Sequence, residues 1–325
     1  MNQVSHNNCD ETKGADMKNG KKVVGIWGCG YVGGNTARLF RECTHGSVEV
    51  LCYDKFKPGI WTNPFELIDR SDYLFICLPT PMDDRGAIDL SYVFDALFEV
   101  DEYIAKDLAK QGKIVITRST IVPGSSDIFS YRFPNLNIAF VPEFLTEKNA
   151  WEDTVNARRV IIGVDEAQVF LEVASLFRLV YPDPEKTAIV KMKRAEAEMY
   201  KYACNYMLAM SVLCANELYS ICDAIGVDYE VVQQNFKLDP RICTHTQVPG
   251  PDGDFGIGGK CFPKDLHALR HLSEQNGYNP ILLNKGLDFN EMIRNNRDWL
   301  DIPGAVSSCG FEKRKEISNA VDCNS

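Results

Sequence analysis

One stretch near the N-terminus restricts the possible folds of this chain more than any other. An apolar run over residues 22–27 leads into a six-residue glycine turn, after which apolar residues recur at helical spacing. Strand, glycine turn and helix in this order are typical of dinucleotide-binding α/β domains, because glycines let the backbone approach a pyrophosphate and the helix N-terminus stabilises its charge. The predicted cofactor contacts in the turn are Gly28, Gly30, Tyr31, Val32 and Gly33.

An acidic residue at the expected distance supports this interpretation. The next apolar run, 48–53, ends at Asp54, which lies 54 − 33 = 21 residues beyond the last glycine of the turn. A carboxylate there accepts hydrogen bonds from the adenosine ribose and repels a 2′-phosphate, so the sequence predicts NAD rather than NADP. Lys55, the next predicted contact, counts against that preference. The alternative is a tight strand–helix turn followed by an incidental acid.

Further apolar runs follow at the spacing of a doubly wound α/β domain. Helical stretches, such as 90–110, separate them. The predicted strands cover residues 72–78, 113–117, 137–141 and 158–164. Alternation of strands and helices predicts a parallel sheet, whose ligands bind beyond the carboxyl ends of the strands.

The loops after these strands supply the next candidate residues. Thr80 and Pro81 follow the third strand, Thr120 follows the fourth, and Glu143 and Glu147 follow the fifth. Two carboxylates at the rim of a cofactor crevice can accept protons or orient water. A solvated glutamate accounts equally well for either residue taken alone, and the prolines are first of all turn formers.

The stretch from residue 191 to about 225 contains neither glycine nor proline and predicts one long helix. At 1.5 Å per residue it would span roughly 50 Å, longer than a small domain is wide. We expect it to join two domains or to pack along a partner subunit. Lys201 and Asn205 lie four residues apart, on one face. The candidate apolar face consists of Met199, Ala203, Met207, Met210 and Leu218.

A cysteine in the C-terminal third of the chain is the predicted nucleophile. Cys261 lies near Lys260 and Lys264, and Pro263 suits the first position of a helix that Gly277 would end. The positive end of the helix dipole and the two lysines should favour thiolate, the reactive form. The alternative is a small buried hydrophobe, which we expect of most other cysteines in the chain.

Composition argues against several other classes of protein. The net charge of -10 and the pI near 5.1 disfavour nucleic acid as the main partner, since neutralising phosphates needs clustered basic residues. Twelve cysteines without a Cys-X-X-Cys pair predict neither a metal site nor a disulfide scaffold, and favour a reducing compartment. No apolar run suggests a membrane span, and residues 1–20 lack the core of a signal peptide, so we expect a cytoplasmic protein.

Six motifs, in order along residues 22–300, resemble those of the UDP-glucose/GDP-mannose dehydrogenase family. They are the glycine turn, Pro79-Thr80-Pro81, Ser119-Thr120 with Val122-Pro123-Gly124, the segment Pro142 to Glu147, the helix with Glu198, Lys201, Asn205, Asn216 and Glu217, and the segment Gly258 to Asp265. The resemblance implies an NAD-dependent four-electron oxidation of the C6 alcohol of a nucleotide-linked hexose to the uronic acid. UDP-glucose and UDP-glucuronate are the expected substrate and product.

The resemblance also implies a covalent mechanism. Cys261, as thiolate, would attack the intermediate aldehyde to give a thiohemiacetal and, after the second oxidation, a thioester that water hydrolyses. Lys201 and Asn205 would stabilise the oxyanion at each tetrahedral stage. Asp265 resembles the family's base or water-activating carboxylate.

Further roles follow from the same resemblance. Thr120 and Glu143 resemble a water-positioning pair supported by Glu147, and Lys264 resembles a contact to the cofactor phosphates. Arg241 resembles a substrate contact that could reach from the other subunit of a homodimer built on the helix 191–225. The residues implied to contact substrate are Glu143, Phe144, Leu145, Glu147, Lys201, Asn205, Arg241, Gly258, Gly259 and Cys261.

These inferences predict an N-terminal Rossmann-type sheet, then a long central helix and an all-helical domain. We expect a disordered leader (1–20), an NAD-binding domain (21–190), a helical dimerisation and catalytic domain (191–300) and a tail (301–325).

The sequence also departs from the family pattern. Lys260 stands where the family often has a small hydroxyl residue, and residues 249–254 lengthen the loop before the cysteine. Family members commonly continue into a further nucleotide-binding domain of about a hundred residues. We expect this chain to be a short form without that domain. Two alternatives stay open: a 3-hydroxyacid dehydrogenase that performs one oxidation with a catalytic lysine, and a non-catalytic NAD- or nucleotide-sugar-binding regulator.

Overall fold

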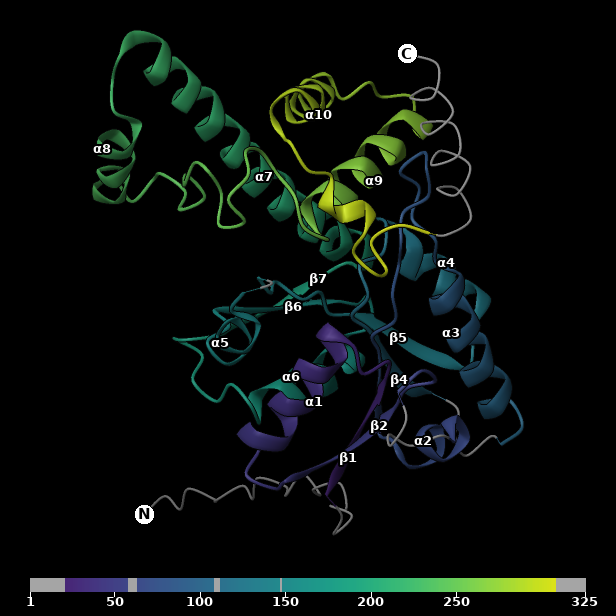
Figure 1. Cartoon of the computed structure of the whole chain (residues 1–325). Coiled ribbons are helices and arrows are strands. Elements are labelled where there is room, and N and C mark those ends of the chain that lie inside the picture. Colours follow the sequence, from purple (N-terminus) through teal and green to yellow (C-terminus); the bar gives the residue numbers. More distant parts are fainter. Residues whose placement is uncertain (1–20, 58–62, 108–111, 147, 308–325) are drawn as a thin grey trace, which may run out of the picture.

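One sheet occupies the N-terminal part of the molecule. The computed structural model describes residues 21–57, 63–107, 112–146 and 148–307, and within them seven strands pair in the order β2-β1-β3-β4-β5-β6-β7 (Figure 1). Their bounds are β1 Lys22–Trp27, β2 Val48–Tyr53, β3 Tyr73–Ile76, β4 Lys113–Thr117, β5 Leu136–Phe140, β6 Arg159–Gly163 and β7 Ala188–Met192. The predicted α/β fold class is confirmed, and the predicted strands match the first six observed ones to within a few residues.

The sequence predicts a parallel sheet, but the observed sheet is not wholly parallel. Strands β1 to β5 run parallel, but β5 pairs antiparallel with β6 through Phe140 and Gly163. The helix of this connection, α5 (Ala150–Val155), has only six residues and rises about 9 Å, whereas a five-residue strand spans about 16 Å. The chain therefore does not return to the amino edge of the sheet before β6 begins.

Strand β7 shortens the predicted long helix at its start. Residues 188–192 pair in parallel with β6, although 191 and 192 were expected to be helical. Helix α7 (Arg194–Ile225) begins after Lys193, whose backbone N–H donates to the side chain of Glu196. This capping interaction fixes the first turn of the helix.

Helices cover both faces of the sheet. Under α1 and α6, the rings of Phe40, Phe75 and Phe177 pack with centroids between 5.6 and 6.2 Å apart. The opposite face is covered by α2, α3 and α4, where Phe94 packs edge-on against Phe133. The bounds are α1 Tyr31–Cys43, α2 Pro64–Arg70, α3 Ser91–Ile104, α4 Ser125–Arg132 and α6 Ala167–Arg178. Cores on both faces leave the carboxyl edge of the parallel strands for ligands.

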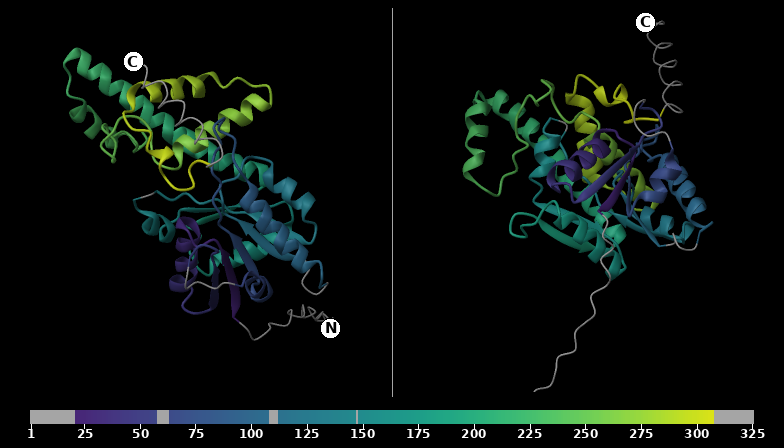
Figure 2. Two further views of the ribbon diagram at one scale, coloured as in Figure 1. Left: turned by 45° about the vertical axis from the view of Figure 1, so that its right-hand side comes forward. Right: turned by 90° about the horizontal axis from the view of Figure 1, so that it is seen from below.

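Helix α7 links the sheet to a second, helical part. Its N-terminal half packs on β5, β6 and α4, and its middle carries α9 (Phe262–Gln275) and α10 (Ile281–Ile293). Its far end bears α8 (Tyr229–Gln234) and the short helix η2 (Phe236–Leu238). Figure 2 shows the helical part, coloured green to yellow, on one end of the sheet domain.

Helix α7 is also long and apolar enough to cross a membrane by length and composition, which the sequence analysis had not expected. The central helix of a water-soluble domain meets the same criterion. Arg194, Glu198 and Lys201 are buried on this helix in contacts with other parts of the protein. These contacts anchor the N-terminal part of the helix in the protein, and 22% of the apolar 18-residue window on which the criterion rests is buried.

The end of the described chain returns to the sheet. Trp299 of η3 (Asp298–Leu300) and Ala305, which follows it, pack on Met82 in the loop after β3. Met82 donates its N–H to the carbonyl of Ala305, and Ser307 donates to the carbonyl of Met82. Residues 301–307 of the predicted tail are thus packed, while the predicted leader 1–20 and residues 308–325 lie outside the described residues.

Candidate active site

The glycine turn has the shape that a pyrophosphate requires. Gly28 has φ +91°, and a Cβ on Gly33 would lie 1.9 Å from the carbonyl oxygen of Gly28, so neither position accepts a side chain. A Cβ on Gly30 would meet nothing within 4 Å, and no side chain caps the N-terminus of α1. An open glycine and a helix N-terminus without a side-chain cap fit the close approach of a dinucleotide phosphate.

Asp54 is connected directly to this turn. Its Oδ2 accepts from the backbone N–H of Cys29 at 2.8 Å, and its Oδ1 accepts from Phe56. The carboxylate therefore lies at the end of β2 beside the turn, where an adenosine ribose would bind. Lys55 is exposed, with its ammonium 6.0 Å from the ring of Phe56.

The other residues predicted to contact the cofactor differ in their surroundings. Val32 packs partly into the core under α1, whereas Tyr31 is exposed and donates its hydroxyl to the carbonyl of Thr146. Thr80 donates to the carbonyl of Thr120 at 2.7 Å and so connects the loops after β3 and β4. Pro81 accepts from the N–H of Asp89 and shapes the first of these loops.

A buried polar cluster joins the sheet to the helical part. Lys201 of α7 donates to both the backbone carbonyl and the carboxylate of Glu143, at 2.7 and 3.1 Å. One turn later, Asn205 donates to Asp265 Oδ2 at 2.6 Å, and Lys264 donates to Asp265 Oδ1 at 2.7 Å. All five residues are at most 7% exposed. The structure thus brings together residues from three distant segments that the sequence had nominated separately.

Cys261 lies beside this cluster, at the N-cap of α9. The helix begins at Phe262, so Pro263 takes its second position rather than the predicted first. Burial, followed by the carboxylates of Asp265 and Glu143, raises the pKa of the thiol to about 11, against the opposing charges of Lys201 and Lys264. The prediction that its surroundings favour the thiolate is therefore wrong in this structure, because the two carboxylates and burial outweigh the lysines.

Lys201 keeps its proton for a related reason. Burial lowers the pKa of its ammonium group, but the nearby Glu143, Asp265 and Cys261 raise it above the usual value. A buried cation held by two carboxylates can donate hydrogen bonds to a developing oxyanion. It is poorly suited to accept a proton.

The glycine loop before Cys261 is held by side chains that the sequence analysis gave no role. Asn216 accepts from the N–H of Gly256, and Asn290 both accepts from the N–H and donates to the carbonyl of Ile257. Asp298 accepts from the N–H of Gly259 at 2.9 Å. One available signal was Asn290 itself, a polar residue at helical spacing after Leu283 and Leu287, and therefore on the buried face of α10.

The remaining residues predicted to contact substrate do not all lie at the cluster. The ring of Phe144 lies 5.4 Å from the ammonium of Lys201, and the N–H of Leu145 donates to Glu143. A Cβ on Gly258 would collide with the guanidinium of Arg294, so Gly258 and Gly259 form a tightly held turn. The side chain of Arg241 is exposed, and its described partner is Asp239, not the cluster. Glu147 lies outside the described residues.

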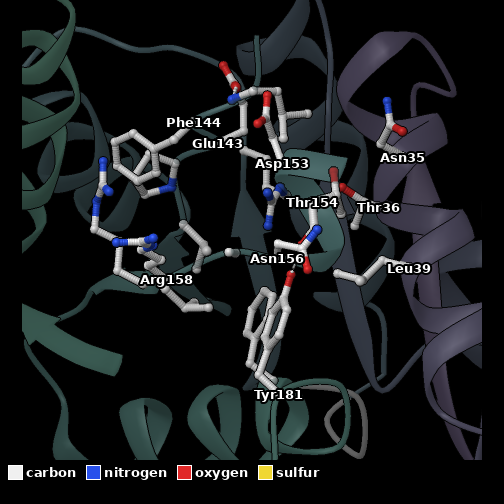
Figure 3. A pocket seen from close by; sticks show the side chains of 18 of the residues that line it. Asn35, Thr36, Leu39, Glu143, Phe144, Asp153, Thr154, Asn156, Arg158 and Tyr181 are labelled. Atoms are coloured by element: carbon white, nitrogen blue, oxygen red, sulfur yellow. Dashed lines mark hydrogen bonds between the residues drawn. The ribbon is translucent and has the colours of Figure 1, made fainter. Parts of the chain in front are cut away.

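A cavity of about 390 Å³ lies next to the cluster. In Figure 3, Asn35, Thr36 and Leu39 of α1 border it opposite Asp153 and neighbouring residues of α5. Glu143, Phe144 and Leu145 line the cavity, but Lys201, Asn205, Cys261 and Asp265 do not. The cavity thus shares Glu143 with the buried cluster and does not include Cys261.

Two family models match the chain over most of its length. Residues 60–181 match the NAD-binding domain of the UDP-glucose/GDP-mannose dehydrogenase family, and residues 195–292 match its central domain.

Curated relatives and solved structures show the same likeness. A UDP-glucose 6-dehydrogenase of Haloferax volcanii is 31% identical over 82% of this chain and 69% of its own length, and one of Rickettsia conorii is 35% identical over 64% and 46%. The chain thus spans between about half and about two thirds of these relatives. The structure of a UDP-glucose dehydrogenase from Pyrobaculum islandicum matches with a TM-score of 0.71 and 28% identity, over 86% of this chain and 70% of that one.

A Mycobacterium tuberculosis 3-hydroxyisobutyrate dehydrogenase shares the fold alone, with a TM-score of 0.61 and 15% identity over 83% of this chain and 93% of that one. The dinucleotide turn, the buried cluster beside Cys261 and the matches to both domain models lead to one conclusion. The chain belongs to the UDP-glucose/GDP-mannose dehydrogenase family and contains its NAD-binding and central domains.

Proposed function

We propose that this protein oxidises the C6 alcohol of a nucleotide-linked hexose to the carboxylate, with UDP-glucose as the substrate and UDP-glucuronate as the product. One observation carries the proposal: the Cys261 thiol lies close enough to Glu143, Lys201, Lys264 and Asp265 for their charges to shift its pKa. A sulfur nucleophile, cationic donors and carboxylates are the groups that two successive oxidations through a thioester require.

The glycine turn, the N-terminus of α1 and Asp54 are the residues that would hold NAD⁺. When bound, NAD⁺ supplies the hydride acceptor for each oxidation. Thr80 and Thr120, joined by their hydrogen bond, shape the crevice beyond β3 and β4.

Lys201 and Asn205 act on the oxygen of the reacting carbon. Both project from one face of α7 and both are buried, so their N–H groups are held in place before the reaction begins. Such preorganised donors stabilise the oxyanion as it develops on a tetrahedral carbon. Lys201 is protonated, which suits it to this role and not to that of the base.

Cys261 forms the covalent bond to the aldehyde carbon. With a pKa of about 11 the group is mainly thiol at neutral pH, so its proton must leave as the sulfur attacks. We assign Asp265 as the acceptor, because its carboxylate lies one helical turn away and is the strongest charged influence on the thiol. The resulting thiohemiacetal is oxidised to a thioester, and water positioned by Thr120 and Glu143 hydrolyses it to the carboxylic acid and the free thiol.

The proposal predicts two NADH for each sugar. Purified protein would be mixed with NAD⁺ and limiting UDP-glucose, GDP-mannose or UDP-N-acetylmannosamine, and NADH absorbance compared with the carboxylate formed. The Cys261→Ser variant should form no carboxylate while still binding NAD⁺. One NADH per substrate with an unimpaired variant would support the 3-hydroxyacid dehydrogenase instead, and NAD⁺ binding without turnover on any nucleotide sugar would support the regulator.

We further propose that residues 21–190 and 191–300 are the two functional domains, and that the second forms a homodimer through α7. The far half of this helix exposes apolar side chains, with Met207 66% and Ile225 68% accessible. Sedimentation velocity should give a dimer for the protein and a shift toward monomer for Ile225→Glu. A monomeric wild-type protein at micromolar concentration would contradict the dimer.

A further inference from the structure

Two cysteines meet beneath the glycine turn. Cys29 is the second residue of the turn, and Cys52 belongs to β2, two residues before Asp54. The registers Ile26–Cys52 and Trp27–Tyr53 bring the two segments side by side, and the Cys29 thiol donates to the carbonyl of Tyr53 at 3.7 Å. Both thiols face the apolar core under α1, and each is the group that most affects the other's pKa. The two cysteines lie close together because Cys52 belongs to β2 and Cys29 follows the neighbouring strand β1.

A cation approaches one member of the pair. Arg41 of α1 directs its Nη2 at Cys52 Sγ, 3.0 Å away. Cys52 is half-buried, whereas Cys29 is only 7% exposed. The neighbouring Cys29 thiol, opposed by burial and supported by Arg41, lowers the pKa of Cys52 to about 6, and the nearby Cys52 together with burial raises the pKa of Cys29. Cys52 is therefore the accessible, anionic sulfur, and Cys29 is the thiol beside it.

We propose that Cys52 and Cys29 form a peroxide-reactive pair, and that their oxidation to a disulfide is coupled to NAD binding. In the first step the Cys52 thiolate attacks hydrogen peroxide and the O–O bond breaks, giving a sulfenic acid and hydroxide. The Cys29 sulfur then attacks Cys52, its proton passes to the leaving oxygen, and water departs as the S–S bond forms. The thiolate and the thiol together lose two electrons, and peroxide is reduced to one molecule of water and one hydroxide, which takes up a proton from solvent.

The coupling arises because Cys29 is part of the cofactor cradle. Its N–H donates to Asp54, and its neighbour Gly28 is packed so tightly that a Cβ there would lie 2.6 Å from the carbonyl oxygen of Cys77. A covalent bond to Cys52 displaces the side chain of Cys29 and with it a turn that has no room to adjust. Linkage then requires the reciprocal effect: bound NAD must disfavour the disulfide.

The test uses the whole chain and NAD⁺ binding by calorimetry, because binding does not depend on the reactivity of Cys261. Hydrogen peroxide should weaken NAD⁺ binding by about tenfold or more, dithiothreitol should restore it, and peptide mass spectrometry should show a Cys29–Cys52 disulfide. Saturating NAD⁺ should slow the appearance of that disulfide. Cys52→Ser should bind NAD⁺ as the reduced wild type does and should be insensitive to peroxide.

Further variants separate the pair from other thiols. Arg41→Gln should slow the oxidation without changing NAD⁺ affinity, and Cys43→Ser, near the end of the same helix, should behave as wild type. The proposal is overturned by a Cys52–Cys77 disulfide, by loss of NAD⁺ binding in peroxide-treated Cys52→Ser, or by full Cys29–Cys52 oxidation with unchanged affinity. These outcomes are independent of the sugar that the enzyme oxidises.

Discussion

Two glycine-rich segments lead into helices in this protein, and they keep their shapes by different means. The turn 28–33 before α1 is fixed by its own backbone, because a Cβ on Gly33 would strike the carbonyl of Gly28, and by one nearby acid, Asp54. The loop 256–259 before α9 is instead held from outside, by Asn216 of α7, Asn290 of α10 and Asp298 of η3.

The two segments differ in how far along the chain the residues that hold them lie. In the first segment, the Gly28–Gly33 contact and the hydrogen bond to Asp54 join residues at most 25 positions apart, although the carbonyl of Cys77 also packs against Gly28. In the second, the hydrogen bonds to the loop span 33 to 40 positions. The cofactor turn is thus locally encoded, whereas the position of Cys261 depends on three helical elements that must first pack together.

The largest expected effect comes from filling the turn. Gly33→Ala places a methyl group 1.9 Å from a backbone oxygen, which we expect to destabilise the protein by about 3 kcal/mol and to abolish NAD⁺ binding. Gly30→Ala meets nothing within 4 Å and should melt with the wild type while binding NAD⁺ at least about tenfold more weakly, or about 1.4 kcal/mol. Thermal melts and calorimetric titration check both. Equal melting temperatures for the two variants would mean that close packing does not fix the turn.

The next largest difference is expected between Cys261, which follows the second segment, and Cys52 of β2, which lies beside the first. Alkylation of Cys261 by iodoacetamide should accelerate about tenfold per pH unit between pH 7 and 9, because its thiolate fraction grows while pH stays below the pKa of about 11. Cys52, with a pKa of about 6, is already thiolate and should show little change over this range. Quenched samples analysed by peptide mass spectrometry give both rates from one experiment. A flat profile for Cys261 would show that its thiol is already ionised.

A smaller effect is expected at the supports of the second loop. Asn290→Ala leaves the buried N–H and carbonyl of Ile257 unpaired, so we expect a loss of about 2 kcal/mol of unfolding free energy and about a tenfold fall in kcat. NAD⁺ affinity should be unchanged. Lys285→Ala, an exposed position on the same helix, is the matched control. Weakened NAD⁺ binding in the Asn290 variant would contradict the independence of the two segments.

The sequence predicted much of this arrangement, and its errors have physical causes. Strand β2 and Asp54 were placed correctly because an apolar run bounded by polar residues is a local signal. Strand β7 was not predicted, and its last two residues, 191 and 192, were expected to be helical because they have no glycine or proline nearby. Pairing with β6 outweighed their local preference. Strand β6 was predicted but its antiparallel direction was not. Strand direction depends on the length of the connection before the strand, which apolar periodicity does not report.

The sequence by itself determined the dinucleotide turn, the fold class and the residues of the buried polar cluster, since each lies in a short-range pattern. Only the tertiary structure decided that Lys201 stays protonated, that Cys261 is a thiol with a raised pKa, and that Asn290 and Asp298 hold the loop before it. The physical reason is that ionisation and loop position depend on burial and on charges or hydrogen bonds from groups distant in the chain. Those distances do not exist until the sheet and the helices have packed.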